Sequence, residues 1–404
     1  MPQKSHIRPA DIRGYSRLAI DATLGLTRLV ETMHHTIART PAPLGKYTRE
    51  PTKGITGLVY RTIHGTTRLV GSGIDALLGQ LIPLLERKPA ASSGKREAVL
   101  AVLNGVLGDH LAASGNPLAI PMEFRRDGHP LRLTAAGLAA SIPQPTGRIL
   151  LLVHGLCMND LQWQRNGHDH GQALAGEGGY TPLYLHYNSG EHVSTNGHAF
   201  AAALETLLQA WPVPVEKLVI LGHSMGGLLA RSACHYGKLA GHAWPKHLQQ
   251  LVFLGTPHHG APLERGGNWV TVMLEFSPYT AALARLAKIR SAGITDLRHG
   301  SIVDEDWKNG DRFAHAKPKR STMSLPQGVQ CFAIGASISK AGGDPKKPRL
   351  GDGLVPLQSA LGRHKDGSLS LHIPDSQQWI GYGMHHMDLL DDATVYERLR
   401  KWLC

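Results

Sequence analysis

Apolar residues recur every three or four positions in the first part of the chain, and this spacing predicts amphipathic helices. One stripe consists of Ala22, Leu26, Leu29, Val30, Met33 and Ile37, and a second of Val59, Ile63, Val70, Ile74, Leu77 and Leu81. A third helix is predicted from Glu97 to Leu111, after a stretch at 88–95 that contains Pro, Ala and Ser. We therefore expect residues 1–115 to form an N-terminal helical segment, which packs on the rest of the chain, self-associates or lies on a membrane.

The pattern changes near residue 117, where short apolar runs begin to alternate with helical stretches. Two short strands are predicted first, at Met122–Arg126 and Leu131–Thr134, joined by a turn at Asp127-Gly128. Runs typical of strands buried on both faces follow at Arg148–His154, Pro182–Tyr187, Lys217–Gly222, Gln250–Gly255 and Gln330–Gly335, with helices at Ala199–Trp211 and Met225–Tyr236. This alternation predicts an α/β fold with a doubly wound, mostly parallel sheet over residues 116–404.

A cap insertion is predicted at about 258–327, between two of the apolar runs. Its apolar positions are Trp269, Val270, Met273, Leu274, Phe276, Tyr279 and Leu283. A helix with these residues could be a lid that excludes water and receives an acyl chain, or it could fill the core of the cap. The pattern indicates no role for the acidic stretch Ser291–Trp307.

The formal net charge of +12 would suit an anionic partner, either nucleic acid or an acidic lipid surface. The basic residues are dispersed, however, and no interleaving of basic and aromatic residues typical of nucleic-acid modules accompanies them, so we expect no nucleic-acid partner. Four widely spaced cysteines show neither a disulfide framework nor metal-ligand spacing, which predicts free thiols in a reducing compartment. With no apolar run that resembles a signal peptide or a transmembrane helix, we expect a cytoplasmic protein, with peripheral membrane contact through the N-terminal helices left open.

The sequence Gly222-His223-Ser224-Met225-Gly226 is a Gly-x-Ser-x-Gly motif directly after an apolar strand and directly before a helix. A serine on such a sharp turn is strained, and its hydroxyl is exposed at the edge of the sheet. The helix N-terminus adds free N–H groups and a positive dipole end, both of which favour a developing oxyanion. Ser224 is therefore the predicted nucleophile.

An earlier strand ends in Val153-His154-Gly155-Leu156. In this architecture one N–H group of an oxyanion hole follows the nucleophile, and another lies in the loop after the earlier strand. Met225 and Leu156 are the predicted donors. We expect His154 to hold this loop through hydrogen bonds, and Cys157 to be a small buried residue.

A nucleophilic serine needs a base, and the fold predicts the chain order serine, acid, histidine. Asp352 lies between two glycines in Gly351–Pro356, on a turn that would let it accept an imidazole N–H. The alternatives Asp344, Asp366 and Asp375 lack this setting at the end of a strand, although Asp375 ends a short apolar run of its own. Asp352 is therefore the predicted acid.

Two adjacent histidines, His385 and His386, follow near the C-terminus, and only one of them can face the serine. The predicted base is His386, because the last helix begins after it and would anchor its position.

Five motifs together resemble the lipase and GPI-inositol-deacylase branch of the α/β-hydrolases. They are Val-His-Gly-Leu at 153–156, Gly-His-Ser-Met-Gly-Gly at 222–227, Gly-Thr-Pro-His-His-Gly at 255–260, Gly-Asp-Gly-Leu-Val-Pro at 351–356 and His-His-Met-Asp-Leu-Leu at 385–390. The resemblance covers residues 148 to about 402 and implies a triad of Ser224, Asp352 and His386. Secreted lipases with the same ending use its aspartate, here Asp388, as a calcium ligand. No second carboxylate is identifiable in the preceding stretch, so we expect neither a metal nor another cofactor.

The function expected from these residues is hydrolysis of a carboxylic ester with an apolar acyl group, on a small-molecule or lipid substrate, through an acyl-enzyme. A thioesterase or an acyltransferase could use the same triad. A non-catalytic scaffold, with the N-terminal helices on a membrane or granule, is the alternative from a different class.

Overall fold

The structure is a computed structural model, and it describes residues 8–39, 59, 61–69, 72, 75, 94–261, 291–308, 323–340 and 351–404. Contacts divide the chain into two compact units. The N-terminal unit comprises residues 1–96 and 111–119, and the larger unit comprises residues 97–110 and 120–404. The predicted boundary near residue 115 and the predicted limits of the cap stay predictions.

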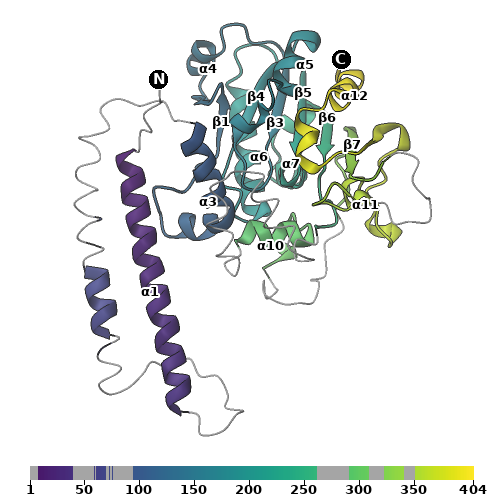
Figure 1. Cartoon of the computed structure of the whole chain (residues 1–404). Coiled ribbons are helices and arrows are strands. Elements are labelled where there is room, and N and C mark those ends of the chain that lie inside the picture. Colours follow the sequence, from purple (N-terminus) through teal and green to yellow (C-terminus); the bar gives the residue numbers. More distant parts are fainter. Residues whose placement is uncertain are drawn as a thin grey trace. The chain divides into compact units, whose positions relative to one another are not determined.

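The described residues of the larger unit contain an eight-stranded sheet with the order β2-β1-β4-β3-β5-β6-β7-β8 (Figure 1). Its strands are β1 Glu123–Arg126, β2 His129–Pro130, β3 Arg148–Val153, β4 Thr181–His186, β5 Lys217–His223, β6 Leu248–Leu254, β7 Gln330–Ser337 and β8 Gln378–Tyr382. The six strands β3 to β8 pair in parallel, and β1 of the β1–β2 hairpin pairs with β4 in the antiparallel direction. The predicted doubly wound, mostly parallel sheet is confirmed.

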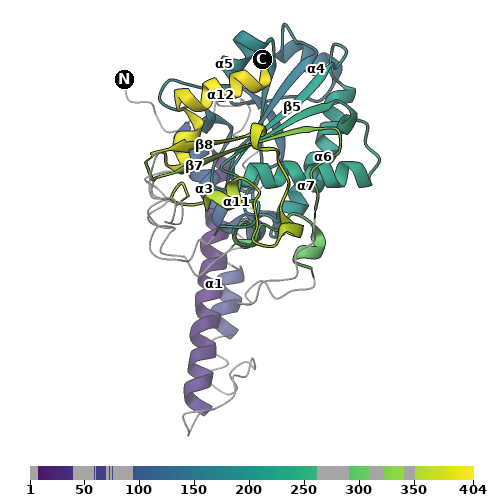
Figure 2. The same cartoon turned by 90° about the vertical axis from the view of Figure 1, so that its right-hand side faces the viewer.

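Helices cover both faces of this sheet, among them α6 and α7 on one face and α5 and α12 on the other (Figure 2). The helices described from residue 94 onward are α3 Gly94–Ala113, α4 Ala135–Ser141, α5 His170–Gly178, α6 Val193–Gln209, α7 Met225–Leu239, α10 Ala292–His299, α11 Leu357–Ala360 and α12 Ala393–Leu403. Short 3-10 helices lie at η1 Asp160–Trp163, η2 Trp244–Lys246, η3 Asp304–Asp306, η4 Gly367–Leu369, η5 Asp375–Gln377 and η6 His386–Leu390.

The core follows from the alternation of side chains along the strands. In β3, Ile149 and Leu151 pack with α6 and α7, whereas Leu150 and Leu152 pack with α5 and α12. Because both sets are fully buried, these strands read in the sequence as continuous apolar runs.

One predicted strand is wrong. Residues 131–134 form no strand; the second strand of the hairpin is the earlier and shorter β2. The side chain of Thr134 instead accepts the N–H of Gly137 and caps α4, as threonine commonly does at a helix N-terminus.

The N-terminal unit contains α1 Pro9–Arg39, the long purple helix of Figure 1. Residues 61–69 are helical as well, as predicted for the first part of the second stripe. Val70, Ile74, Leu77 and Leu81 lie outside the described residues. Among the described residues, no helix is both long enough and apolar enough to cross a bilayer.

Candidate active site

Ser224 lies at the carboxyl edge of the sheet, on the turn between β5 and α7. Its backbone angles are φ 54° and ψ −124°, a conformation that non-glycine residues rarely adopt. Its N–H donates to the carbonyl of Leu254 at the end of β6, at 2.8 Å. Gly226, two residues after the serine, cannot be replaced by a residue with a side chain, because a Cβ atom there would lie 2.2 Å from the carbonyl oxygen of Val153. The motif therefore folds as the strained strand-to-helix turn that its sequence predicts.

Asp352 and His386 are brought together, although 34 positions separate them. The Nδ1 atom of His386 lies 2.7 Å from Oδ2 of Asp352, and the exposed fractions of the two side chains are 3% and 0%. The other carboxylate oxygen accepts the N–H groups of Leu354 and Val355, at 2.9 and 2.8 Å. A backbone bond of 3.1 Å from His386 N to Asp352 O adds a second link. These bonds fix the orientation of both the Asp352 carboxylate and the His386 imidazole.

The imidazole of His386 lies beside the Ser224 turn. Its ring centroid is 4.7 Å from that of His223, the residue before the serine. A Cβ atom on Gly255, the residue after Leu254, would lie 3.0 Å from Cε1 of the His386 ring. Among the described residues, Nε2 of His386 has no hydrogen-bond partner. Nδ1 is thus bonded to a carboxylate, whereas Nε2 makes no hydrogen bond to the Ser224 hydroxyl or to any other described group.

The other candidate acids and the neighbouring histidine lie in different settings. Asp366 caps η4, and Asp375 forms an exposed ion pair with Arg363 at 2.8 Å. Asp344 lies outside the described residues. His385 is exposed, whereas His386 is buried.

The loop after β3 packs directly against Ser224. A Cβ atom on Gly155 would lie 3.0 Å from Cβ of Ser224, so the predicted donor Leu156 is one residue from this contact. The second predicted donor, Met225, is the first residue of α7. Both belong to segments that adjoin the serine.

Hydrogen bonds hold this loop in shape. The ring of His154 stacks on Tyr187 at 4.4 Å, and the Tyr187 hydroxyl donates to the His154 carbonyl at 2.9 Å. Burial lowers the pKa of His154 to about 4, which keeps the ring neutral at pH 7. Cys157 is buried, and its N–H donates to Oγ of Ser189 at 3.0 Å. Burial raises the pKa of its thiol to about 12, so it is no thiolate nucleophile at neutral pH.

The sequence reasoning missed three residues at this site. Tyr187 and Ser189 follow β4 directly, and the rule that ligand sites lie beyond the carboxyl ends of strands could have found them. His223 lies inside the serine motif, and its Nε2 is 3.4 Å from the carbonyl oxygen of His386. Burial holds the pKa of His223 well below its usual value, and the adjacent His386 lowers it further. A neutral His223 leaves a protonated His386 without a charged neighbour at this contact.

The cap is described only in part. Residues 262–290, with all seven apolar positions of the predicted lid helix, lie outside the described residues. In the acidic stretch, Asp296 is buried and accepts the N–H of Val193 at 2.8 Å and Nδ1 of His192 at 3.0 Å. Asp306 accepts the N–H groups of Ile302 and Val303. The stretch therefore anchors its own loop and the start of α6.

The carboxylate of Asp388 accepts the N–H of His385 at 2.8 Å and so caps η6. Where the structure describes side chains, no group of three or more His, Cys, Asp or Glu residues is placed to hold a metal ion.

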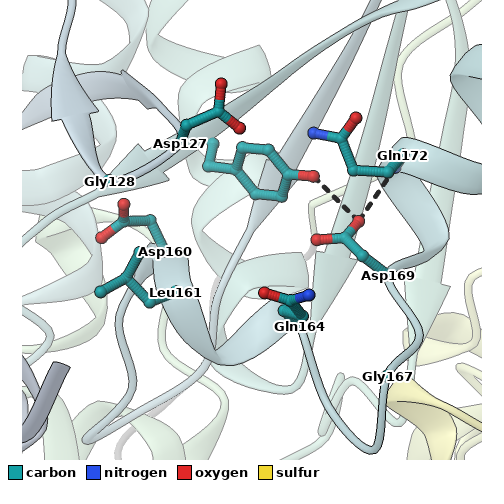
Figure 3. Close-up of a pocket in the computed structure, with 9 residues that line it drawn as sticks. Asp127, Gly128, Asp160, Leu161, Gln164, Gly167, Asp169 and Gln172 are labelled. Atoms are coloured by element: carbon teal, nitrogen blue, oxygen red, sulfur yellow. Dashed lines mark hydrogen bonds between the residues drawn. The ribbon is translucent and has the colours of Figure 1, made fainter. Parts of the chain in front are cut away.

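A separate polar cavity of about 270 Å³ lies beside β4, and it contains none of the predicted site residues (Figure 3). It is lined by Asp127, Gly128, Asp160, Leu161, Gln164, Gly167, Asp169, Gln172 and Tyr184. Two of its carboxylates have structural partners: Asp169 caps α5 and accepts the Tyr184 hydroxyl at 2.8 Å, and Asp160 pairs with Arg125 at 3.3 Å.

Residues 144–330 match the family model described as a PGAP1-like alpha/beta domain. Together with the strand order and the Ser224 turn, this match decides the architecture. The chain has the α/β-hydrolase fold. The resemblance drawn from the motifs is confirmed over the matched range, which includes Ser224 and ends before Asp352 and His386.

Solved structures that align with the chain include lipases and esterases. The mature lipase BlEst2 of Bacillus licheniformis is 17% identical over 64% of this chain and 94% of its own, with a TM-score of 0.41. Aspergillus fumigatus lipase B is 11% identical over 98% and 85%, with a TM-score of 0.41. A Thermogutta terrifontis esterase is 14% identical over 70% and 92%, with a TM-score of 0.35. None of the curated proteins matches the chain.

Proposed function

We propose that this protein is a serine hydrolase that cleaves carboxylic esters with Ser224, His386 and Asp352. One observation carries the proposal: a buried imidazole, bonded at 2.7 Å to a buried carboxylate, lies beside a serine on a strained strand-to-helix turn. Strain and buried charge both cost stability, and such features concentrate where they serve catalysis.

The mechanism follows from the different roles of the two nitrogen atoms of the His386 imidazole. Nε2 of His386 takes the proton of Ser224 as its Oγ attacks the ester carbonyl, while Asp352 stabilises the imidazolium through Nδ1. The N–H groups of Leu156 and Met225 stabilise the oxyanion, each by about 3 kcal/mol. The proton then passes to the leaving alcohol. Water, activated by the same imidazole, releases the acid from the acyl-enzyme.

We further propose that the acyl group is apolar. The support is the composition of the cap, in which aromatic and aliphatic residues gather at 269–283. A cover of this kind would exclude water and bind an acyl chain. We also place the protein in the cytoplasm, a proposal that the free thiols of Cys157, Cys234, Cys331 and Cys404 support.

A substrate panel tests the reaction. Purified protein is given p-nitrophenyl esters of increasing acyl length, and separately acyl-CoA with and without an alcohol acceptor. Turnover of medium or long esters, with free acid as the product, supports the proposal. Preference for acyl-CoA would indicate a thioesterase, and transfer to the alcohol would indicate an acyltransferase.

The Ser224→Ala variant is the matched control for each substrate. It should lose nearly all turnover and its reaction with a fluorophosphonate probe, while it keeps the circular dichroism spectrum of the wild type. If the wild type itself fails to react with the probe, the catalytic proposal is wrong and the scaffold interpretation gains support.

A further inference from the structure

The N-terminal unit carries most of the net positive charge of the protein. Residues 1–96 contain 15 lysines and arginines but only 6 acidic residues, an excess of nine of the twelve net charges of the whole chain. Residues 111–119, which complete the unit, add no charged side chain. The other three quarters of the chain are therefore close to neutral.

One side of α1 is occupied by contacts within this unit. Arg13 pairs with Asp75 at 2.7 Å, and Arg17 pairs with the same carboxylate. A Cβ atom on Gly14 would lie 2.3 Å from Cγ of Leu118, so this part of the helix is closely packed. The acidic Asp11 is buried and pairs with Arg96 at 2.5 Å.

The adjoining face of α1 is apolar and exposed. Ile12, Tyr15, Ala19 and Ala22, which we call the apolar stripe, recur at steps of three and four and are all exposed. Ile12 keeps 51% of its surface and Tyr15 keeps 41%. In the sequence, Leu26 continues the same spacing.

The helical residues 61–69 also have exposed apolar side chains, here together with exposed arginines. Ile63 is 40% exposed and Leu69 is 75% exposed. The exposed Arg61 and Arg68 are seven positions apart and share a face of the helix, on the side away from Ile63. Exposed apolar residues on one face and basic residues on another are typical of helices that bind at a membrane interface.

We propose that the N-terminal unit docks on the surface of an anionic lipid bilayer. The apolar stripe enters the boundary between headgroups and acyl chains, and the basic side chains contact the anionic headgroups. A second copy of the chain fits the same face less well, because it would bring together two units with nine excess positive charges each. Docking of this kind needs no helix that crosses the bilayer.

Vesicle co-sedimentation of the full chain tests the proposal without reference to catalysis. The protein is mixed with vesicles of phosphatidylcholine alone, or with about a third of phosphatidylglycerol, at low and high salt. We expect sedimentation with the anionic vesicles at low salt and its loss at high salt, because charge attraction is screened. Equal binding to both kinds of vesicle, or none, would overturn the proposal.

Two paired variants assign the binding to this unit. Ile12→Ser/Tyr15→Ser removes the largest side chains of the apolar stripe, and Arg61→Glu/Arg68→Glu reverses two exposed charges. Each should weaken binding to anionic vesicles at least about tenfold. The controls lie in the larger unit: Leu239→Ser, at an apolar residue that is 69% exposed, and Lys238→Glu/Lys246→Glu, at two exposed lysines.

The controls should bind as the wild type does. If they lose binding equally, or if the two test variants keep it, docking through this unit is wrong. Light scattering of the vesicle-free protein examines self-association. A dimer that the Ile12→Ser/Tyr15→Ser variant abolishes would show that a second copy, and not a bilayer, covers the stripe.

Discussion

Asp352 and His386 are joined twice, by the 2.7 Å bond between the carboxylate and Nδ1 and by the 3.1 Å bond between their backbones. The carboxylate also accepts two backbone N–H groups, so its position does not depend on the histidine alone. Two residues that are 34 positions apart thus hold each other in place, with the imidazole ring 4.7 Å from that of His223, the residue before Ser224.

Asp352→Asn should lower kcat by about 10⁴ with little change in KM, because an amide can hold the imidazole in the wrong tautomer and cannot stabilise its positive charge. Steady-state kinetics on the best p-nitrophenyl ester measure both constants. Asp375→Asn is the matched control, since Asp375 forms only an exposed ion pair with Arg363. A loss in the Asp375 variant that equals the loss in the Asp352 variant would contradict the assigned acid.

Ser224→Gly should be inactive but more stable than both the wild type and Ser224→Ala. The backbone angles of φ 54° and ψ −124° are strained for any residue with a Cβ atom and are accessible to glycine. Release of this strain should raise the free energy of unfolding by about 1 kcal/mol, even after the larger entropy of glycine in the unfolded chain is counted. Urea denaturation of the three proteins measures the difference. Equal stability of the glycine and alanine variants would show that the turn is not strained.

Gly105→Ala should impair catalysis from outside the predicted site. In α3, a Cβ atom on Gly105 would lie 2.2 Å from Sγ of Cys157, the residue after the proposed donor Leu156. Displacing this donor should lower kcat by up to about a hundredfold, with a smaller effect on KM. When Cys157→Gly is added to the Gly105→Ala variant, part of kcat should be restored, because the sulfur is removed and glycine suits the φ of 60° at position 157.

The control for this substitution is Gly176→Ala, at a helical glycine with no atom within 4 Å of an added Cβ. It should leave kcat unchanged and stabilise the protein by up to about 1 kcal/mol through helix propensity. If Cys157→Gly does not rescue Gly105→Ala, the effect of the alanine does not pass through the loop after β3.

The parts of the fold that the sequence predicted are those with a strong local signal. The parallel strands are buried on both faces, so their apolar runs are continuous, and the serine turn has its own motif. The edge strand β8 was missed because Gln378–Tyr382 is only partly buried and does not alternate. The helix α5 was missed because His170–Gly178 contains three glycines and, among its buried residues, one leucine.

The pairing of Asp352 with His386 could be predicted from the order of the motifs along the chain. The contacts that hold the surrounding loops in place could not. The contact of Gly105 with Cys157 joins residues 52 positions apart, and no local pattern encodes which glycine of a helix meets which loop. The same holds for His170, whose Nε2 lies 3.0 Å from the carbonyl oxygen of Leu389, in the 3-10 helix that begins at His386. Such contacts depend on tertiary packing, so they become visible only in the structure.

His170 makes the stability of the protein depend on pH. A carbonyl only accepts hydrogen bonds, so Nε2 donates to Leu389, and Nδ1 faces Nε2 of His168 at 2.8 Å. Burial lowers the pKa of His170 to about 4. Between about pH 6.5 and pH 4 the unfolded chain therefore binds a proton that the folded chain does not, and stability falls as the pH falls through this window. The loss from this residue between pH 7 and pH 5 should be about 2 kcal/mol.

His170→Gln removes this titration while its amide can still donate to the Leu389 carbonyl. The variant should be less stable than the wild type at pH 7, where the packing of the imidazole is lost, but its stability should fall less on acidification. Urea midpoints at pH 7 and pH 5 measure both effects. His154, with a pKa lowered to about 4 by burial, has the same sign and should keep part of the pH dependence in the variant. An unchanged difference between pH 7 and pH 5 would mean that His170 is already protonated in the folded protein at pH 5, which its burial opposes.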